Sequence, residues 1–343
     1  MTTFSLAQLE AAQQIVGEYM PPTPTYQWPL LSAELGCSVW VKHENQTPTG
    51  AFKVRGGLVF AHELVKHSAE TKQPLPAGLI TATRGNHGQS VPYAACRLGI
   101  PVTVLVPEGN SAEKNAAMAG WGATVEVLGK DFDEAREIAA ARVADTSDSA
   151  GTTWQFVPSF SEPLVRGVAT YALELFRTAP RLDRVYVPIG MGSGVCGVLA
   201  VRDLLGLTTE VIGVVSAAAD AVALSVEQGR HVTTGSAATF ADGLACRVPA
   251  QAALDLIAPG VGHSGVARIV RVSDAEVAQA VRLLYRTTHN VAEGAGAAAC
   301  AALMQERAGG RVASDDVNAV VLSGGNIDAH WFAQVLAGGT PTP

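Results

Sequence analysis

One lysine, Lys53, stands between apolar residues in a glycine-flanked segment, GAFKVRGG at 50–57. Burial of an amine disfavours its charged form, which lowers its pKa and leaves it nucleophilic towards an aldehyde. Most lysines, however, are solvated surface charges. The segment therefore indicates a nucleophilic lysine only if the fold brings other functional groups close to Lys53.

A glycine-rich turn at 188–197, PIGMGSGVCG, lies between a strand pattern and the apolar helix pattern VLAVRDLL. Backbone N–H groups at such a turn can converge on a phosphate at the helix N-terminus. Residues 192–197 also match G-x-G-x-x-G, so a dinucleotide-binding oxidoreductase is the rival hypothesis. That class expects an acidic residue after the next strand, where this chain has Ser216, with Asp220 only after three alanines. A purely structural turn is the third interpretation.

The lysine segment resembles the cofactor-lysine motif of the pyridoxal-phosphate fold type II family, in its threonine/serine dehydratase and serine racemase branch. That motif reads E-N-x-Q-x-[TV]-G-[AS]-F-K-x-R-G, and residues 44–56 read ENQTPTGAFKVRG, with Thr47 at the Gln position. Three motifs follow in the family's order. TRGNHGQ at 83–89 resembles the S-x-G-N-H-[AG]-Q loop, 190–194 the phosphate cradle, and SGGN at 323–326 the S-G-[GA]-N strand end. The resemblance spans roughly residues 20–336.

The resemblance implies a role for each motif residue. Lys53 would hold pyridoxal 5'-phosphate as a Schiff base and remove the substrate's α-proton, Phe52 would flank the pyridine ring, and Asn86 would hydrogen-bond the 3'-hydroxyl. Ser323 would face the pyridine nitrogen. Backbone donors for the phosphate would come from Gly190, Met191, Gly192, Ser193 and Gly194. The substrate carboxylate would lie on the loop of Thr83, Arg84, Gly85, Asn86 and His87.

A serine opposite the pyridine nitrogen does not keep it protonated, which favours prompt loss of a β-leaving group. The resemblance therefore implies a dehydratase (ammonia-lyase) that removes water and then ammonia from a β-hydroxy amino acid to give a 2-oxo acid. Threonine, serine, 3-hydroxyaspartate and phenylserine all fit the motifs. Within the family the alternative is β-replacement, in which a second nucleophile such as a thiol is added.

Position 84 departs from the pattern, because related racemases carry there a small hydroxyl residue that acts as a second base. An arginine stays protonated near neutral pH, so we expect weak or absent racemisation. Two interpretations of Arg84 are open. Its guanidinium binds a substrate carboxylate, including a second one on a β-hydroxy dicarboxylic acid, or it turns to solvent or bonds neighbouring carbonyls.

The phosphate cradle also departs from the family pattern. Met191 and Ser193 replace family glycines, so they adopt glycine-like backbone angles or the loop shifts. Some relatives bind a divalent cation after the strand that ends near Ser216, where this chain has only the carboxylate of Asp220, so we expect no metal. Glu293, in the family-like stretch 292–296, is either a cofactor contact or a helix N-terminal acid. The stretch 239–243, TFADG, also resembles a family segment that lines the site.

The elements that must position these turns follow an alternating pattern. Strands are predicted at 38–42, 79–81, 102–106, 124–128, 184–189, 211–215 and 319–322. Helices are predicted at 86–98, 111–120, 132–144, 162–176, 274–287 and 294–307, with a capping box at 273–276. Alternation of this kind predicts an α/β fold with parallel strands, whose ligand sites lie at the carboxyl ends of the strands.

The resemblance implies the pyridoxal-phosphate fold type II (tryptophan synthase β-like) architecture, with two lobes that each hold a mainly parallel sheet flanked by helices. A length of 343 residues suits two lobes. We expect a large cofactor-binding domain from 1–77 and 156–343 and a small domain from 78–155. The resemblance also suggests a homodimer.

Bulk properties exclude several classes of protein. A net charge of −7 and the absence of any dense basic run argue against a nucleic-acid partner. No stretch has the apolar length of a membrane span and the N-terminus lacks a cleavable signal pattern, so we expect a cytoplasmic enzyme.

The five scattered cysteines form no CxxC pair and are expected to be buried thiols. The chain ends about 17 residues after the SGGN motif, which favours a catabolic enzyme without a regulatory domain, and its tail after Ala337 is expected to be disordered.

Overall fold

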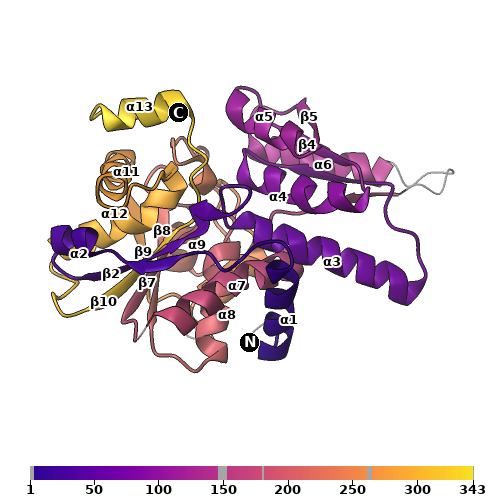
Figure 1. Ribbon diagram of the computed structural model, residues 1–343. Helices are drawn as coiled ribbons and strands as arrows, with labels where there is room; N and C mark the ends of the chain where they lie inside the picture. The colour runs from indigo at the N-terminus through magenta and orange to yellow at the C-terminus, as the bar shows by residue number, and fades with distance from the viewer. Residues whose placement is uncertain (1–3, 146–152, 180, 261–264, 343) are drawn as a thin grey trace.

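The computed structural model describes residues 4–145, 153–179, 181–260 and 265–342. It contains two sheets (Figure 1). The larger has the strand order β1 (Thr25–Gln27), β2 (Ser38–His43), β10 (Val317–Leu322), β7 (Arg184–Pro188), β8 (Glu210–Ser216) and β9 (Arg268–Val272). The smaller has the order β5 (Thr124–Val127), β4 (Val102–Val106), β3 (Gly78–Ala82) and β6 (Trp154–Phe156).

Every pairing except β1 with β2 is parallel. Strands β3 and β4 are buried at all positions, as parallel strands covered on both faces must be. The predicted α/β fold with mainly parallel sheets is confirmed. The sequence did not reveal β1 and β6, which have three residues each, or β9 at the edge of the larger sheet.

Helices cover both faces of the larger sheet. One core layer lies under α2 (Pro29–Leu35), α11 (Asp274–Thr288), α12 (Gly294–Ala308) and α13 (Ala329–Leu336). The opposite layer lies under α1 (Leu6–Gly17), α7 (Glu162–Thr178), α8 (Ser193–Leu204), α9 (Ala221–Gln228) and α10 (Gln251–Ile257). The predicted capping box starts α11, where Ser273 and Glu276 bond each other's backbone N–H.

The smaller sheet is covered by three helices, which Figure 1 shows together on one side of the molecule. Helices α4 (Asn86–Ala95) and α5 (Ala112–Gly120) pack on one face through Val91, Ala95 and Met118. Helix α6 (Phe132–Asp145) packs on the other face through Ala135 and Ala139. Short 3-10 turns follow β2 (Glu44–Gln46), α4 (Cys96–Leu98) and α9 (Asp242–Leu244).

Helix α3 (Lys53–Thr71) lies against both α4 and α7 and so bridges the helices of the two sheets (Figure 1). The sequence predicts no helix in this region, which is wrong, since α3 begins at Lys53 itself. Two glycines permit this packing. A Cβ on Gly56 would lie 2.8 Å from the carbonyl oxygen of Leu164, and one on Gly57 would lie 2.6 Å from that of Ser90.

The chain after Ala337 makes hydrogen bonds up to Thr340, so the prediction of a disordered tail is wrong for 338–340. Arg282 donates to the carbonyl of Gly339, and the amide of Gln334 donates to the carbonyl of Thr340. All five cysteines are free, and four are buried, with Cys96 partly buried, which agrees with the expected thiols. Among the described residues, no helix has the length and apolar character needed to cross a membrane.

Candidate active site

One cavity collects residues from all four glycine turns. Its lining includes every site residue predicted from the sequence: Phe52, Lys53, Thr83, Arg84, Gly85, Asn86, His87, Gly190, Met191, Gly192, Ser193, Gly194 and Ser323. These residues come from the start of α3, the β3–α4 loop, the β7–α8 loop and the end of β10. The sheets therefore bring together groups as distant in the chain as Phe52 and Ser323, at the strand ends where open α/β sheets bind ligands.

Lys53 is the first residue of α3, and its Nζ donates a hydrogen bond of 3.0 Å to Ser193 Oγ. Burial lowers the pKa of the Lys53 amine to about 8. The amine also lies 5.2 Å from the centre of the Phe52 ring. A substantial fraction of this amine is thus neutral, and therefore nucleophilic, at mildly alkaline pH.

The glycine-rich cradle opens the N-terminus of α8. Gly192 has φ +95°, in the left-handed region, while Met191 and Ser193 do not share that conformation. Of the two alternatives for Met191 and Ser193, glycine-like backbone angles or a shifted loop, the first is therefore excluded. A Cβ on Gly190 would lie 2.2 Å from the carbonyl oxygen of Gly243, so this position must be glycine. No side chain caps the N-terminus of α8, so the first backbone N–H groups of this helix are left without a side-chain acceptor.

The β3–α4 loop closes on itself, because the backbone N–H of Gly85 donates to Thr83 Oγ1 at 3.0 Å. Asn86 then begins α4, and no side chain caps this helix N-terminus. The Asn86 amide is held on both sides. Its Nδ2 donates to Glu293 Oε1 at 2.6 Å, and its Oδ1 accepts from Asn326 Nδ2 at 2.8 Å.

Glu293 stands at the N-cap of α12 without capping that helix, and its buried side chain points to Asn86 and the cavity. Burial raises its pKa to about 7, against the lowering effect of the Lys114 charge. Lys114 is itself buried and forms a short ion pair with Asp242. Glu293 thus stands at the start of α12, as the helix N-terminal interpretation expects, and also lines the cavity, as the cofactor-contact interpretation expects.

The sequence did not predict Lys114, because this residue belongs to no motif and its partner Asp242 lies 128 positions away in the chain. Asp242 had one signal, the family-like stretch TFADG. Two other lining residues, Pro188 and Ala295, lie in the segments 188–197 and 292–296 that the sequence had singled out. The remaining lining residues had no recognised signal, namely Phe132, Ser159, Leu244, Ala245 and Cys246.

His87 is buried in the wall of the cavity. Burial and the neighbouring charge of Lys53 together lower its pKa to about 3. The imidazole is therefore neutral at physiological pH and cannot act as a proton donor in its charged form.

Arg84 differs from the other charged groups of the cavity. It is partly buried, and it makes no hydrogen bond or ion pair with any residue in the described part of the chain. The interpretation in which it bonds neighbouring carbonyls thus lacks support in this structure.

The SGGN segment at 323–326 is tied directly to the lysine segment. The backbone N–H of Phe52 donates to the carbonyl of Ser323 at 3.0 Å, and an antiparallel bridge joins Ala51 to Gly324. Gly50, at φ +70°, makes the turn before them. Ser323 is therefore held in register with the residues that flank Lys53.

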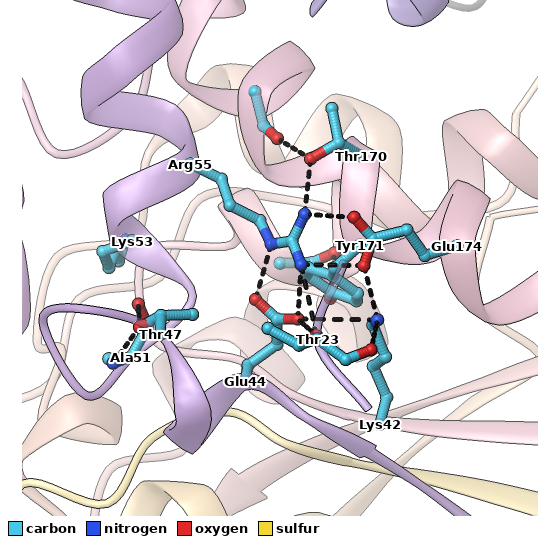
Figure 2. A network of polar contacts seen from close by, with 12 residues as sticks. Thr23, Lys42, Glu44, Thr47, Ala51, Lys53, Arg55, Thr170, Tyr171 and Glu174 are labelled. Atoms are coloured by element: carbon cyan, nitrogen blue, oxygen red, sulfur yellow. Dashed lines mark hydrogen bonds and ion pairs between the residues drawn. The ribbon is translucent and has the colours of Figure 1, made fainter. Parts of the chain in front are cut away.

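A buried ionic network lies beside the lysine segment (Figure 2). The Arg55 guanidinium bonds Glu44 at 2.7 Å and 3.0 Å and Glu174 at 2.7 Å and 2.8 Å. Lys42 Nζ joins them through Glu174 at 2.5 Å. Burial alone would raise the pKa of Glu44, but Arg55 and Lys42 outweigh it and hold that pKa below its usual range. The network fixes the first turn of α3, and Lys53 lies two residues before Arg55.

The segment after β8 takes no part in the cavity. Ser216 Oγ accepts from the backbone N–H of Ala218, and Asp220 pairs with Arg271 at 2.8 Å. Within the described ranges, no group of three or more His, Cys, Asp or Glu side chains is placed to hold a metal ion.

The residues present fit pyridoxal phosphate. The cofactor needs an amine for its aldehyde, donors for its phosphate and a partner for its pyridine nitrogen. The cavity offers Lys53 with a lowered pKa, the uncapped N-terminus of α8 behind a glycine that admits no Cβ, and Ser323 at the end of β10.

Comparison with known proteins gives the same result. The model of the family described as "Pyridoxal-phosphate dependent enzyme" matches residues 17–324. An L-threonine ammonia-lyase of Geobacter sulfurreducens is 35% identical, over 90% of this chain and 72% of its own. One of Thermotoga maritima is 30% identical, over 97% and 78%. The crystal structure of a threonine deaminase from T.th. superimposes with a TM-score of 0.81 at 32% identity, over 95% of this chain and 99% of its own.

These matches exclude the rival oxidoreductase, because the glycine fingerprint at 192–197 lies inside the matched family region. The chain belongs to the pyridoxal-phosphate-dependent enzyme family, in its threonine/serine dehydratase and serine racemase branch, and is a pyridoxal-phosphate-dependent lyase.

Proposed function

We propose that this enzyme is an ammonia-lyase that converts a β-hydroxy amino acid of the threonine/serine type into a 2-oxo acid and ammonia. The observation that carries the proposal is the hydrogen bond of 3.0 Å between Lys53 Nζ and Ser193 Oγ, which sets the reactive amine beside the phosphate cradle. The names of the relatives, L-threonine ammonia-lyases, support the reaction class.

Bound pyridoxal phosphate supplies an electron sink for the charge that develops at the substrate's α-carbon. Ser193 and its neighbours in the 190–194 loop would hold the phosphate with backbone N–H groups, and Phe52 would flank the ring. Asn86 would donate to the 3'-oxygen in an orientation fixed by Glu293 and Asn326.

Lys53 would then act as the base that takes the α-proton. Its pKa of about 8 suits a group that must be neutral before the transfer and charged after it. The substrate carboxylate would bind the uncapped N-terminus of α4, with Thr83 and Gly85 shaping the loop. Neutral His87 would border this site without adding charge.

Ser323 would face the pyridine nitrogen and leave it unprotonated, which favours elimination over α-proton return. Arg84 cannot serve as a second base because a guanidinium stays charged. We therefore propose weak or absent racemisation. Chiral chromatography of residual L-serine tests this, and D-serine formed as fast as pyruvate would contradict it.

We also propose that residues 78–155 act as a small domain over the large domain of 1–77 and 156–343. The separate four-stranded sheet and the contacts of Asn86 and Lys114 with Glu293 and Asp242 support this division. A homodimer is proposed from the family resemblance, and light scattering of the purified enzyme tests it. The cytoplasmic location predicted from the sequence stays a prediction.

A panel assay tests the function. Purified enzyme is incubated with serine, threonine, 3-hydroxyaspartate and phenylserine, and both 2-oxo acid and ammonia are measured. Parallel reactions contain a thiol, because the alternative of β-replacement predicts a thioether amino acid in place of the oxo acid. Equal amounts of oxo acid and ammonia, unchanged by the thiol, are expected.

A further inference from the structure

We propose that the substrate carries a second negatively charged group on its β-carbon and that Arg84 binds that group. The natural substrate class is then a β-hydroxy dicarboxylic amino acid rather than serine or threonine. This inference rests on the proposed ammonia-lyase function and deepens it.

The first support is the state of Arg84 itself. Its side chain lines the same cavity as Lys53 and is partly removed from solvent. In the described part of the chain it has no acceptor of any kind, although a guanidinium presents five N–H donors. Taking a guanidinium partly out of water without an acceptor costs free energy, which an anionic ligand would offset.

The second support is the balance of charge in the cavity. The charge of Lys114 is matched by its ion pair with Asp242. Glu293, with a pKa of about 7, is only partly ionised at neutral pH. Lys53 is committed to Ser193 and to the cofactor's aldehyde. Arg84 is therefore the cation of this cavity that has no assigned counter-charge among the described residues.

The third support is that the α-carboxylate common to all amino acids already has a site. Helix α4 begins at Asn86 without a side-chain cap, so the first backbone N–H groups of its opening turn are free. Those donors and the helix dipole suit one carboxylate. Arg84 lies two positions before this helix and is left for a different anion, for which its planar fork gives a bidentate contact.

The chemistry is balanced for such a substrate. In 3-hydroxyaspartate the α-proton and the β-hydroxyl leave as water. Hydrolysis of the resulting imine takes up one water and releases ammonia. The products are oxaloacetate and ammonia, and no oxidant or reductant is needed.

The test compares L-serine with the isomers of 3-hydroxyaspartate, which differ from it only by the β-carboxylate. The enzymes are wild type, Arg84→Met, Arg84→Lys and a control, Arg142→Met, whose residue pairs with Glu126 outside the cavity. We expect wild type to prefer one isomer of 3-hydroxyaspartate over serine in kcat/KM. Arg84→Met should lower kcat/KM for that isomer about 10- to 100-fold, the value of a hydrogen bond to a charged group, and change it for serine less than about threefold. Arg84→Lys should lie between, and Arg142→Met should match wild type.

An equal loss on both substrates would assign Arg84 to the α-carboxylate and overturn the proposal. No loss on either, or a wild-type preference for serine, would overturn it as well.

A binding measurement separates this inference from the proposed function. Succinate and butyrate share a four-carbon skeleton but carry two carboxylates and one. Succinate should raise the melting temperature of the holoenzyme more than butyrate, and Arg84→Met should abolish the difference. If no hydroxy amino acid yields a 2-oxo acid, the ammonia-lyase proposal fails, and this comparison still shows whether Arg84 selects a second carboxylate.

Discussion

Ser193 Oγ accepts a hydrogen bond of 3.0 Å from Lys53 Nζ, which joins the first residue of α8 to the first residue of α3. The two residues lie 140 positions apart in the chain. Lys53 would supply the amine for the cofactor's aldehyde, and Ser193 belongs to the 190–194 loop proposed for its phosphate.

Removing the Ser193 hydroxyl should weaken cofactor binding without preventing it. Backbone donors of the 190–194 loop persist in Ser193→Ala, so we expect the dissociation constant of pyridoxal phosphate to rise about 5- to 30-fold, the value of one or two hydrogen bonds. Titration of the visible absorbance of cofactor-free protein measures it. Ser68→Ala, at the other end of α3, is the control and should bind as wild type does. An unchanged constant in Ser193→Ala would remove Ser193 from the phosphate site.

The lowered pKa of Lys53 should appear in the rate of cofactor capture. Only the neutral amine attacks an aldehyde. With a pKa of about 8 instead of 10.5, about a quarter of the amine is neutral at half a unit below its pKa, whereas an ordinary lysine would be about 0.1% neutral there. Stopped-flow mixing of cofactor-free enzyme with pyridoxal phosphate should show a rate that rises with pH and levels off above about 8. A rate still rising steeply at pH 10 would contradict the burial argument.

Arg55 should be a residue on which folding depends. Arg55→Met would leave the carboxylates of Glu44 and Glu174 buried with Lys42 as their one remaining cation in this network. Breaking a buried pair in this way costs about 3–5 kcal/mol. We expect a lower urea midpoint and partial loss of bound cofactor. The matched control is Arg177→Met, which breaks an exposed pair with Glu10 and should cost less than about 1 kcal/mol. Equal effects of the two changes would refute this role.

The raised pKa of Glu293 makes a prediction about stability and pH. The folded pKa of about 7 exceeds the ordinary value of 4.5, so the folded state holds a proton that the unfolded state has lost between these values. The contribution of this group therefore favours folding at low pH and falls as pH rises from 4.5 to 7. Glu293→Gln removes the titration. We compare the free energies of unfolding of Glu293→Gln and wild type, both free of cofactor. The difference, variant minus wild type, should rise by about 2–3 kcal/mol between pH 5 and pH 8. Parallel pH profiles for the two proteins would contradict this assignment.

Much of the fold follows from local patterns. Burial of parallel strands requires runs of apolar residues, so the sequence predicts the strands at 102–106 and 184–189. The capping box at 273–276 is a local motif that marks the start of α11. Helix α3 was missed because Gly56 and Gly57 are unfavourable within a helix. Their reason is tertiary, since both glycines let α3 approach α7 and α4 closely.

The residues of the site likewise fall into those that local motifs predict and those that depend on tertiary contacts. Lys53, Asn86 and Ser323 were predicted because they stand in contiguous motifs. Lys114 was not, because a long polar side chain in an amphipathic helix pattern gives no sign of burial. Its ion pair with Asp242 depends on how the smaller sheet meets the larger one, which local sequence does not record.

The most direct test of the proposed chemistry is product release from β-hydroxy amino acids by wild type and Lys53→Ala. Ammonia and 2-oxo acid are measured together over the panel of serine, threonine and 3-hydroxyaspartate. We expect equal amounts of the two products from wild type on at least one substrate, and none above background from Lys53→Ala, because the variant lacks both the cofactor's anchor and the base. Undiminished release by Lys53→Ala, or no release by wild type that shows bound cofactor in its visible spectrum, would contradict the proposal.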